Sequence, residues 1–492
     1  FNKKHSLGVT LLQSIQQDLQ EDLSGKVQKL PSDILKYYDL ASGLMIDGVG
    51  SDYIKWNMAS FMGRVNYGYM GRYLLTLSAR YDGSSRLAEG HKWVLFPSAA
   101  LAWRISDEPF MKDLVWLDNL KLRVGYGKTG NSAVSPYQTK GQLALRHYVF
   151  NNGSSEYIGY APSVMANDQL TWETTDQWNV GVDFGFLKNR INGTVEFYLQ
   201  NTKDLLLKRQ LPVVSGFSSV MSNVGSTRNK GIEITLNTRN IMNRNFTWST
   251  DLTFSANKEE IVELYNGKTD DVGNLWFIGQ PIDVYYNYKK IGIWQNTEND
   301  LAEMAKFNEK GANFKPGSIR LEDVDGDYKI TEEDKQILGS VRPKFVASMV
   351  NNFEFKGFDL SVFLYASVGG LLRNNIEFME KPGRGNTVKV DYWTPTNPTN
   401  AFPRPSVDVE KLDYISTLGY DKADFLRIRN ITLGYTLPEM WSKKVLMDKI
   451  RIYLSANNPA IFTNFTGIDP EGANGRTAPS YSTWMFGINL SM

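Results

Sequence analysis

The sequence contains no cysteine among its 492 residues, and only three histidines. Without cysteine, disulfide scaffolds, thiolate metal sites and cysteine nucleophiles are excluded. No apolar run approaches the ~20 residues that a membrane-spanning helix needs, which excludes a helical membrane protein. A β-barrel membrane protein stays open, because its strands are apolar on one face only. The net charge of +1 leaves no overall field to attract nucleic acid.

Aromatic residues are abundant, with 25 Tyr, 25 Phe and 12 Trp. This is too much apolar surface for a disordered chain, so we expect a folded protein. The chain starts at Phe1 without an initiator Met or a signal-like segment, which we interpret as a fragment or a processed piece.

Alternation of apolar and polar residues dominates the chain. Within residues 191–200, Ile191, Val195 and Phe197 fall on one face, and polar side chains fall on the other. The same pattern recurs in residues 73–81, 120–126, 232–237 and 248–256. These segments run to about ten residues, whereas globular strands average about five or six. Their length matches a tilted strand that crosses a bilayer, although a β-sandwich with shorter strands would show the same alternation.

We therefore predict an all-β fold, a transmembrane antiparallel β-barrel with long extracellular loops. The apolar-alternating residues 484–492 end the chain, and we expect this strand to close the barrel by pairing with the first strand. Two short segments, 12–23 and 298–308, are the best helix candidates. Long polar connections are expected at residues 17–56, 83–92, 129–170, 266–345 and 373–424, and short turns at 188–190 and 243–245.

Motifs of enzyme chemistry are poorly represented. Gly125, Gly127 and Gly130 spell G-x-G-x-x-G after a strand, but no helix-forming segment follows to receive a phosphate, so we interpret the match as a decoy. The sequence contains no H-E-x-x-H and no G-x-S-x-G. A glycosidase needs only two carboxylates, so a glycan-active enzyme stays a weak alternative. We predict no organic cofactor.

One segment, residues 323–334, resembles a twelve-residue calcium loop. Its candidate ligands are the side chains of Asp323, Asp325, Asp327, Thr331 and Asp334 and the carbonyl of Lys329. Two positions depart from the pattern, because Tyr328 replaces the usual Gly and Asp334 the usual Glu. The segment is either a calcium site that stiffens its loop or an acidic, solvated turn.

Aromatic residues gather in the same region. Trp276, Tyr285, Tyr286 and Trp294 are candidates for stacking on a sugar or peptide solute. Packing of the loops against each other is the alternative interpretation, and it is the commoner outcome.

Several blocks, in this order, resemble one protein family. They are residues 120–131, 172–183, 223–233, 316–334, 402–404, 425–435, 457–459 and 467–471. Each block is weak alone, but together they are similar to the SusC/RagA family of TonB-dependent outer-membrane transporters of Bacteroidetes. The resemblance spans about residues 57 to 492.

The resemblance implies a 22-stranded barrel in the outer membrane, with an N-terminal plug inside it and a SusD-like surface lipoprotein as its lid. It implies import of oligosaccharides or oligopeptides, driven through TonB. The plug, the TonB box and the first strands have no counterpart here, so residues 1–492 resemble the C-terminal part of the barrel, about 14 to 16 strands. An N-terminal plug and barrel portion would complete it. The region 266–345 would be a long extracellular loop that includes residues 323–334.

Polar residues of the strands would then line the lumen, namely Arg80, Lys121, Arg123, Glu196, Glu233 and Arg239. The loops at 129–170, 266–345 and 373–424 would face outside and meet solute and lipoprotein. Two rival functions stay open, a secreted β-rich glycan-active enzyme and a passive structural outer-membrane barrel.

Overall fold

The computed structural model describes residues 4–153, 155–374, 390–405, 413–472 and 480–492. Fourteen strands form one antiparallel sheet in chain order. They are β1 (His5–Gln28), β2 (Met45–Tyr69), β3 (Tyr73–Ser84), β4 (Trp93–Arg104), β5 (Leu117–Asn131), β8 (Glu173–Phe186), β9 (Ile191–Lys203), β12 (Ser226–Met242), β13 (Phe246–Glu263), β18 (Phe345–Phe355), β19 (Phe358–Val368), β22 (Phe425–Thr436), β23 (Lys449–Thr463) and β24 (Thr483–Ser491).

Smaller elements lie in the connections. Five two-stranded ribbons are β6 (Gln142–Phe150) with β7 (Ser155–Val164), β10 (Leu206–Gln210) with β11 (Ser219–Asn223), β14 (Val284–Asn287) with β17 (Gln336–Ser340), β15 (Lys290–Ile293) with β16 (Ile319–Leu321), and β20 (Leu371–Arg373) with β21 (Tyr420–Lys422). The α-helices are α1 (Glu298–Glu309) and α2 (Glu439–Ser442). None of the helices in the described ranges is long and apolar enough to cross a membrane.

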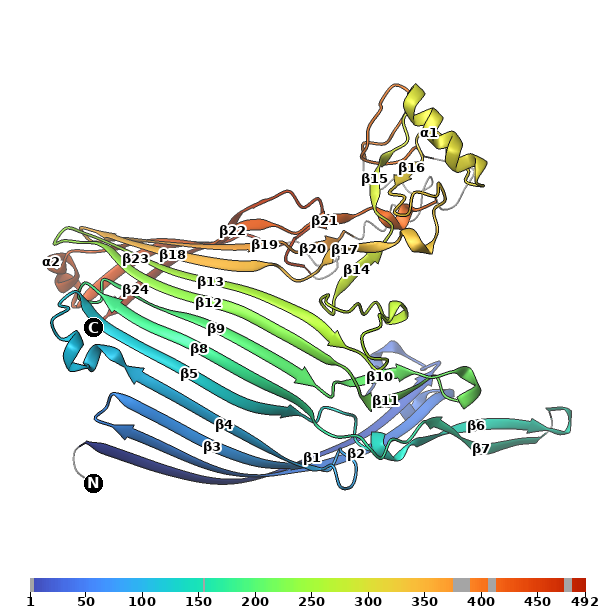
Figure 1. The fold of residues 1–492 in the computed structure, drawn as a ribbon, viewed down its shortest axis with the longest axis horizontal. Coiled ribbons are helices and arrows are strands. Elements are labelled where there is room, and N and C mark those ends of the chain that lie inside the picture. The colour runs from blue at the N-terminus through green and yellow to red at the C-terminus, as the bar shows by residue number, and fades with distance from the viewer. Residues whose placement is uncertain (1–3, 154, 375–389, 406–412, 473–479) are drawn as a thin grey trace.

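The large sheet curves into a wall, as Figure 1 shows. This confirms the predicted all-β fold with the antiparallel architecture of a barrel wall. The last strand, β24, was expected to pair with the first, β1. Within the described residues it does not, since β24 pairs with β23 alone and β1 with β2 alone. The wall is therefore an open arc of a barrel.

The two ends of the wall differ in their connections. At one end, the short-turn end, most neighbouring strands are joined by tight turns, including the predicted turns at residues 188–190 and 243–245, while residues 105–116 and 437–448 form longer connections with short helical turns. In the second of these turns, the Asn243 carboxamide oxygen accepts the backbone N–H groups of Asn245 and Phe246. The extended connections, with all five ribbons, lie at the opposite, long-loop end (Figure 1). This asymmetry is typical of outer-membrane barrels.

Two predictions for the first 56 residues were wrong. Residues 12–23, predicted as a helix, lie within β1, and most of the loop predicted at 17–56 belongs to β1 and β2. The two strands pair from His5 to Gln28, so the true connection is residues 29–44. Residues 12–23 lack a clear two-residue alternation, because Leu12, Ile15, Leu19 and Leu23 recur every three or four positions, as on a helix. The backbone hydrogen bonds with β2 stabilise these residues as a strand rather than as a helix.

The helix predicted at 298–308 is confirmed as α1. Thr297 caps it, since its hydroxyl accepts the backbone N–H of Asp300 at 3.3 Å. Glu298 and Asp300 lie in its first turn, where carboxylates stabilise the positive end of a helix dipole. Its buried residues, Met304 and Phe307, are three positions apart and face the same side.

Residues 288–335, 390–404 and 413–419 fold together into a small unit, which we call the cap. Its core has two adjoining clusters of buried residues, Ile293, Ile319, Leu321, Trp393, Ile415 and Leu418 in one and Trp294, Met304, Phe307 and Phe314 in the other. Ile330 and Tyr414 pack against both clusters and join them. The cap projects from the long-loop end of the wall (Figure 1). The connection predicted as one long loop at 266–345 therefore contains much of a folded unit.

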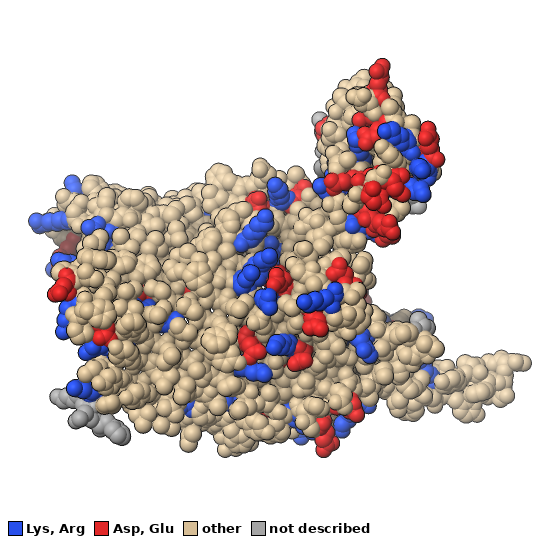
Figure 2. Space-filling model, in the orientation of Figure 1, with Lys and Arg blue, Asp and Glu red and all other residues tan. Residues whose placement is uncertain are grey.

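One face of the wall is an apolar band. Its cross-strand neighbours run in rows, such as Leu122, Val182, Val195, Ile234 and Phe254 on five successive strands. Figure 2 shows this band as a broad, largely uncharged zone with charges gathered toward its ends. The other face of each strand is polar, so the band is the lipid-facing side and the polar face lines the interior.

The packing of the cap core gives a testable prediction. Phe307→Ala removes a buried ring from the cap and is expected to destabilise the cap by about 3–5 kcal/mol. Limited proteolysis should then cut within residues 288–335, while the wall keeps its heat-dependent shift in gel mobility. Leu301→Ala on the same helix, where Leu301 is 42% exposed, is the matched control and should leave the cap resistant. Equal proteolysis of both variants and the unchanged protein would show that the cap is not held by this core.

Candidate functional site

The polar face of the wall carries a cross-strand ion network. Arg123 of β5 contacts Asp183 of β8 (Nη2 to Oδ1, 2.7 Å) and Glu196 of β9 (Nη2 to Oε1, 2.5 Å). Lys121 lies 3.5 Å from the same Asp183 carboxylate. Three of the six residues predicted to line the lumen thus meet in one cluster, whose charges largely neutralise each other. The cluster gives the interior a fixed, polar surface.

Of the other predicted lumen residues, Glu233 borders that cluster, and Arg80 and Arg239 lie apart from it. Arg80 of β3 pairs with Asp82 (Nε to Oδ1, 2.7 Å) and donates to the Ser60 hydroxyl at 2.9 Å. Glu233 lies opposite Glu196 in the β9–β12 register, and Arg239 lies at a register shift near the short-turn end of β12.

A second ion cluster lies where β22 meets the β23–β24 connection. The Arg427 side chain is buried, and its guanidinium contacts Asp469 (Nη2 to Oδ1, 2.7 Å) and Glu471 (Nε to Oε2, 3.0 Å). Arg429 pairs with the other oxygen of Glu471. Burial alone would raise the pKa of Asp469, but hydrogen bonds from the Ser480 hydroxyl and the Glu471 backbone, with the Arg427 charge, hold it below its usual range. The sequence blocks 425–435 and 467–471 thus meet in space, which their separate motifs did not reveal.

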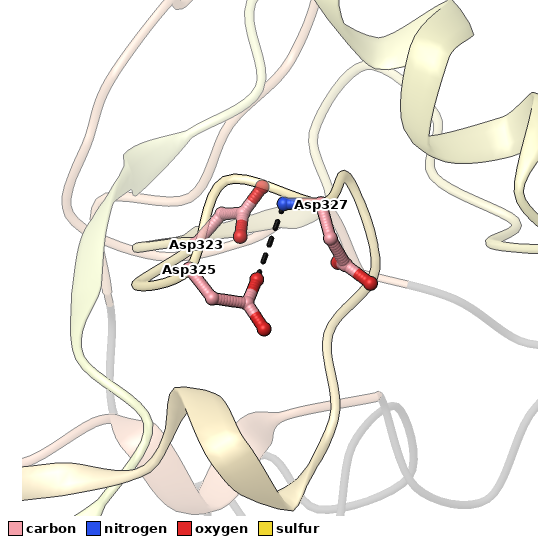
Figure 3. Close-up of side chains that lie close together, drawn as sticks. All are labelled: Asp323, Asp325 and Asp327. Carbon is pink, nitrogen blue, oxygen red and sulfur yellow. Dashed lines mark hydrogen bonds between the residues drawn. The ribbon is translucent and has the colours of Figure 1, made fainter.

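The acidic segment of the cap brings three carboxylates together. Asp323, Asp325 and Asp327 each offer an oxygen, and these oxygens lie within 4.8 Å of one another (Figure 3). Within the described residues, this is the one group of three or more such ligands. Backbone N–H groups orient the carboxylates, because Asp323 accepts from Gly326 and Tyr328, and Asp325 accepts from Asp327.

The backbone of this segment turns where a calcium loop requires it. Tyr328 has a φ of +62°, the left-handed conformation that glycine usually supplies at this position. Its ring packs edge-on against Phe307 of α1 at 5.4 Å between centroids, and the Lys306 ammonium lies 5.0 Å from the ring centre. The tyrosine thus makes the required turn and also fastens the loop to the helix.

The remaining predicted ligands have other partners. Asp334 is fully buried, and its two oxygens accept the backbone N–H groups of Val324 and Thr331. Thr331 caps the short 3₁₀ turn at Glu332–Asp334, and the backbone N–H of Lys329 donates to Asp327. Asp334 therefore closes the loop rather than joining the three-carboxylate group. The three gathered carboxylates fit a hard cation such as Ca²⁺, since their oxygens converge and none forms an ion pair within the described residues.

The four aromatic candidates separate into two groups. Trp294 is only 1% exposed and packs against Phe307 and Phe314, so it is a core residue of the cap and cannot stack on a solute. Trp276, Tyr285 and Tyr286 are half-buried in the connection between β13 and β18. Tyr286 packs on Phe277 at 4.8 Å, and Tyr285 meets Tyr420 edge-on at 5.2 Å.

A partly buried lysine, Lys290, connects two parts of the cap. Lys290 of β15 donates to the carbonyls of Asn400 and Ala401 at 2.8 and 2.7 Å. Its burial lowers the pKa of its ammonium. Asn400 in turn accepts the backbone N–H of Ile293, so residues 400–401 are held against β15 by side chains and backbone together. The contact between Lys290 and residues 400–401 could not be predicted from the sequence, because it depends on tertiary folding.

The glycine motif at residues 125–130 lies entirely within β5, and strand or loop follows it. This confirms that it is a decoy, because a phosphate-binding turn needs the N-terminus of a helix.

Comparison with known proteins shows which family the chain resembles. The family model for TonB-dependent receptor-like β-barrels matches residues 19–459. TonB-dependent receptor P3 of Formosa agariphila is 32% identical over all of this chain and 51% of its own length. TonB-dependent receptor SusC of Bacteroides thetaiotaomicron is 32% identical over 88% of this chain and 43% of its own length.

The solved structures agree on the fold. A structure of the RagAB peptide importer in the "open-open" state superposes with a TM-score of 0.82 at 25% identity, over 100% of this chain and 53% of that one. A second RagAB structure, of the peptide transporter, gives a TM-score of 0.83 at 24% identity over 99% of this chain.

The chain thus spans about half the length of the curated relatives it matches. Those relatives are named receptors rather than enzymes. From the family model, the relatives and the fold together, the chain belongs to the SusC/RagA type of TonB-dependent receptor β-barrels, which are proteins of the outer membrane.

Proposed function

We propose that the protein imports an oligomeric nutrient, an oligosaccharide or oligopeptide, across the outer membrane, and that this chain forms the barrel wall and the loops on which a lid docks. The observation that carries the proposal is the two-sided wall. Its outward face is apolar, its inward face holds neutralised ion pairs such as Arg123 with Asp183 and Glu196, and a folded cap stands at the long-loop end.

The proposed partners follow from the same arrangement. An N-terminal portion with a plug would complete the barrel beside β1 and β24, and TonB would act through that plug. A SusD-like surface lipoprotein would meet the cap and the other long-loop connections. The likeness to RagAB structures, whose titles describe a peptide transporter, supports this complex and favours testing peptides alongside glycans.

Two rival functions are less well supported. A secreted glycan-active enzyme would need an exposed carboxylate pair in a cleft of a soluble protein, whereas the apolar band suits a bilayer. A passive structural barrel would have no need for a folded cap or for a lipoprotein lid.

The decisive experiment is purification of this protein from its native outer membrane in mild detergent, with mass spectrometry of everything bound to it. The proposal predicts a plug-bearing portion and a surface lipoprotein in stoichiometric amounts. Deletion of the gene should abolish growth on one class of oligomeric nutrient, and comparison of glycans with peptides identifies which class. Recovery of the chain alone in the soluble fraction would contradict the proposal.

Truncation of an aromatic side chain that contacts the solute should lower solute uptake. Trp276→Ala is expected to lower solute uptake by about 2- to 10-fold at limiting concentration, because a lost aromatic contact weakens binding by about 0.5–1.5 kcal/mol. Radiolabelled uptake in intact cells measures it. Trp441→Ala, which removes an exposed ring from α2 at the short-turn end, is the control and should transport normally. Unchanged uptake by the Trp276 variant would remove this residue from the solute path.

We further propose that the loop at residues 323–334 holds Ca²⁺ as a stiffening ion. Asp323, Asp325 and Asp327 would hold it, with the Lys329 carbonyl nearby in sequence. When bound, the ion supplies positive charge that offsets the repulsion among three carboxylates. Thr331 and Asp334 keep their place in the loop's own hydrogen bonds.

Calcium dependence of the cap is directly measurable. Calcium at about 100 times its Kd should stabilise the cap by about 2.7 kcal/mol, so a chelator should make residues 288–335 sensitive to protease. The Asp325→Asn, Asp327→Asn double variant should be sensitive with or without calcium and should lose bound ⁴⁵Ca²⁺. Glu333→Gln, an exposed acid outside the three-carboxylate group, is the control. Retention of ⁴⁵Ca²⁺ by the double variant would show that these carboxylates do not bind the ion.

A further inference from the structure

Two lysines stand directly opposite one another on the lipid-facing side of the wall. Lys230 of β12 and Lys258 of β13 are partners in the strand register. Alternation places them on the same face as Ile232 and Ala256 of the apolar band. Both side chains are exposed. Like charges directly opposite in an antiparallel pair repel each other, so this arrangement favours an anion bound between them.

The two lysines form the first charged row beyond the apolar rows of β12 and β13, toward the long-loop end. The same register row continues through Leu199 to Trp178 and Tyr126. The rings of Tyr126 and Trp178 pack at 4.9 Å, and such rings gather at the interface of a bilayer with water. The row lies toward the long-loop end, which in an outer-membrane barrel faces outside the cell. The strands of such barrels are tilted, so a register row does not run at constant height. The lysines are placed by the band itself, because they lie at its border toward the outer leaflet, where the head groups begin.

Nearby acids are already paired. One row further out, Glu260 lies 3.5 Å from Arg228, which also donates to Asn201 at 3.0 Å. Within the described residues, neither Lys230 nor Lys258 forms an ion pair. Both strands lie in the middle of the fourteen-stranded order, so a portion that joins the free edges at β1 and β24 cannot cover them.

Next to the lysines the wall is hollowed. β13 and β18 pair only as far as Ala256 with Phe345, and beyond that point β13 is paired with β12 alone. The hollow there measures about 1310 Å³. Its basic residues are Lys230, Lys258, Arg342, Lys344 and Lys422, its acidic residues are Glu259 and Asp424, and its apolar residues include Phe197, Ile232, Phe345 and Leu371.

The two acids of this hollow have partners. Glu259 lies 3.7 Å from Arg342, and Asp424 accepts the backbone N–H of Gly369 at 2.5 Å. Lys344 and Lys422, like the opposed pair, form no ion pair within the described part of the chain. Figure 2 shows the basic side chains running over this part of the wall beside the uncharged band. The surface is thus cationic at the head-group level and apolar directly below it.

We propose that this hollow is a binding site for the phosphorylated head group of an outer-leaflet lipid, with Lys230 and Lys258 as its central phosphate ligands. A phosphate between the two ammonium groups relieves their repulsion. The acyl chains of the same lipid lie along Ile232, Ala256 and the rows below them. Lysines at a membrane surface attract anionic head groups in this way. Lys230 and Lys258 lie on the lipid-facing side, so the proposal does not depend on which solute the barrel carries.

The test is native mass spectrometry of the purified protein with added monophosphoryl lipid A as the probe. The unchanged protein should keep the lipid bound and should prefer it over the same lipid without its phosphate. The Lys230→Gln, Lys258→Gln double variant should bind it at least about tenfold more weakly, because two surface cations are lost. The Lys230→Arg, Lys258→Arg variant keeps the charge and should retain binding.

The control variant removes equal charge elsewhere. Lys188→Gln with Lys449→Gln neutralises two exposed lysines at the short-turn end and should bind the lipid as the unchanged protein does. Equal weakening by both glutamine variants, or equal binding of the dephosphorylated lipid by the unchanged protein, would overturn the proposal. The comparison of the two lipids needs no variant, so it tests binding of the phosphate even if the double variant fails to fold.

Discussion

The structure depends on one constraint, which is that a backbone inside a bilayer must satisfy its hydrogen bonds without water. An antiparallel ladder does so strand by strand, and each strand of the wall within the described residues pairs with its neighbour in the chain. Once the ladder is fixed, side chains can only alternate between lipid and interior. The rows of apolar residues on one face and the Arg123–Asp183–Glu196 network on the other are consequences of that alternation.

Outside the bilayer, water can satisfy backbone hydrogen bonds, so the chain is not restricted to strands there. The connections at the long-loop end are free to build helices and cores, and the cap does so around Trp294 and Phe307. Tyr328 illustrates how local and tertiary demands meet in one residue, since it adopts a left-handed turn in the acidic loop and packs its ring on α1. Lys290 performs a similar task from β15, because its ammonium holds a segment more than a hundred residues away in sequence.

The strands were predictable where one face is apolar and the other polar, as in residues 191–200 and 248–256. Helix α1, predicted at residues 298–308, is capped by Thr297 and buries Met304 and Phe307 on one side. The prediction was wrong for residues 12–23, because Leu12, Ile15, Leu19 and Leu23 recur at helical spacing although these residues pair with β2 as a strand. Of the candidate site residues, Asp323, Asp325 and Asp327 converge as expected from local sequence. Trp294 and Asp334 do not fit their predicted roles. Trp294 is buried against Phe307 and Phe314. The two oxygens of Asp334 accept the backbone N–H groups of Val324 and Thr331 within the loop itself.

The central claim is the alternation of lipid-facing and interior-facing residues along a membrane-spanning wall, and the absence of cysteine makes it directly measurable. Single cysteines at Ile234 and at the adjacent Thr235 would each carry a nitroxide spin label in the native outer membrane. The account predicts that the label at 234 collides with dissolved oxygen, which concentrates in lipid, while the label at 235 is shielded from that lipid phase. Equal oxygen accessibility at the two positions would contradict it.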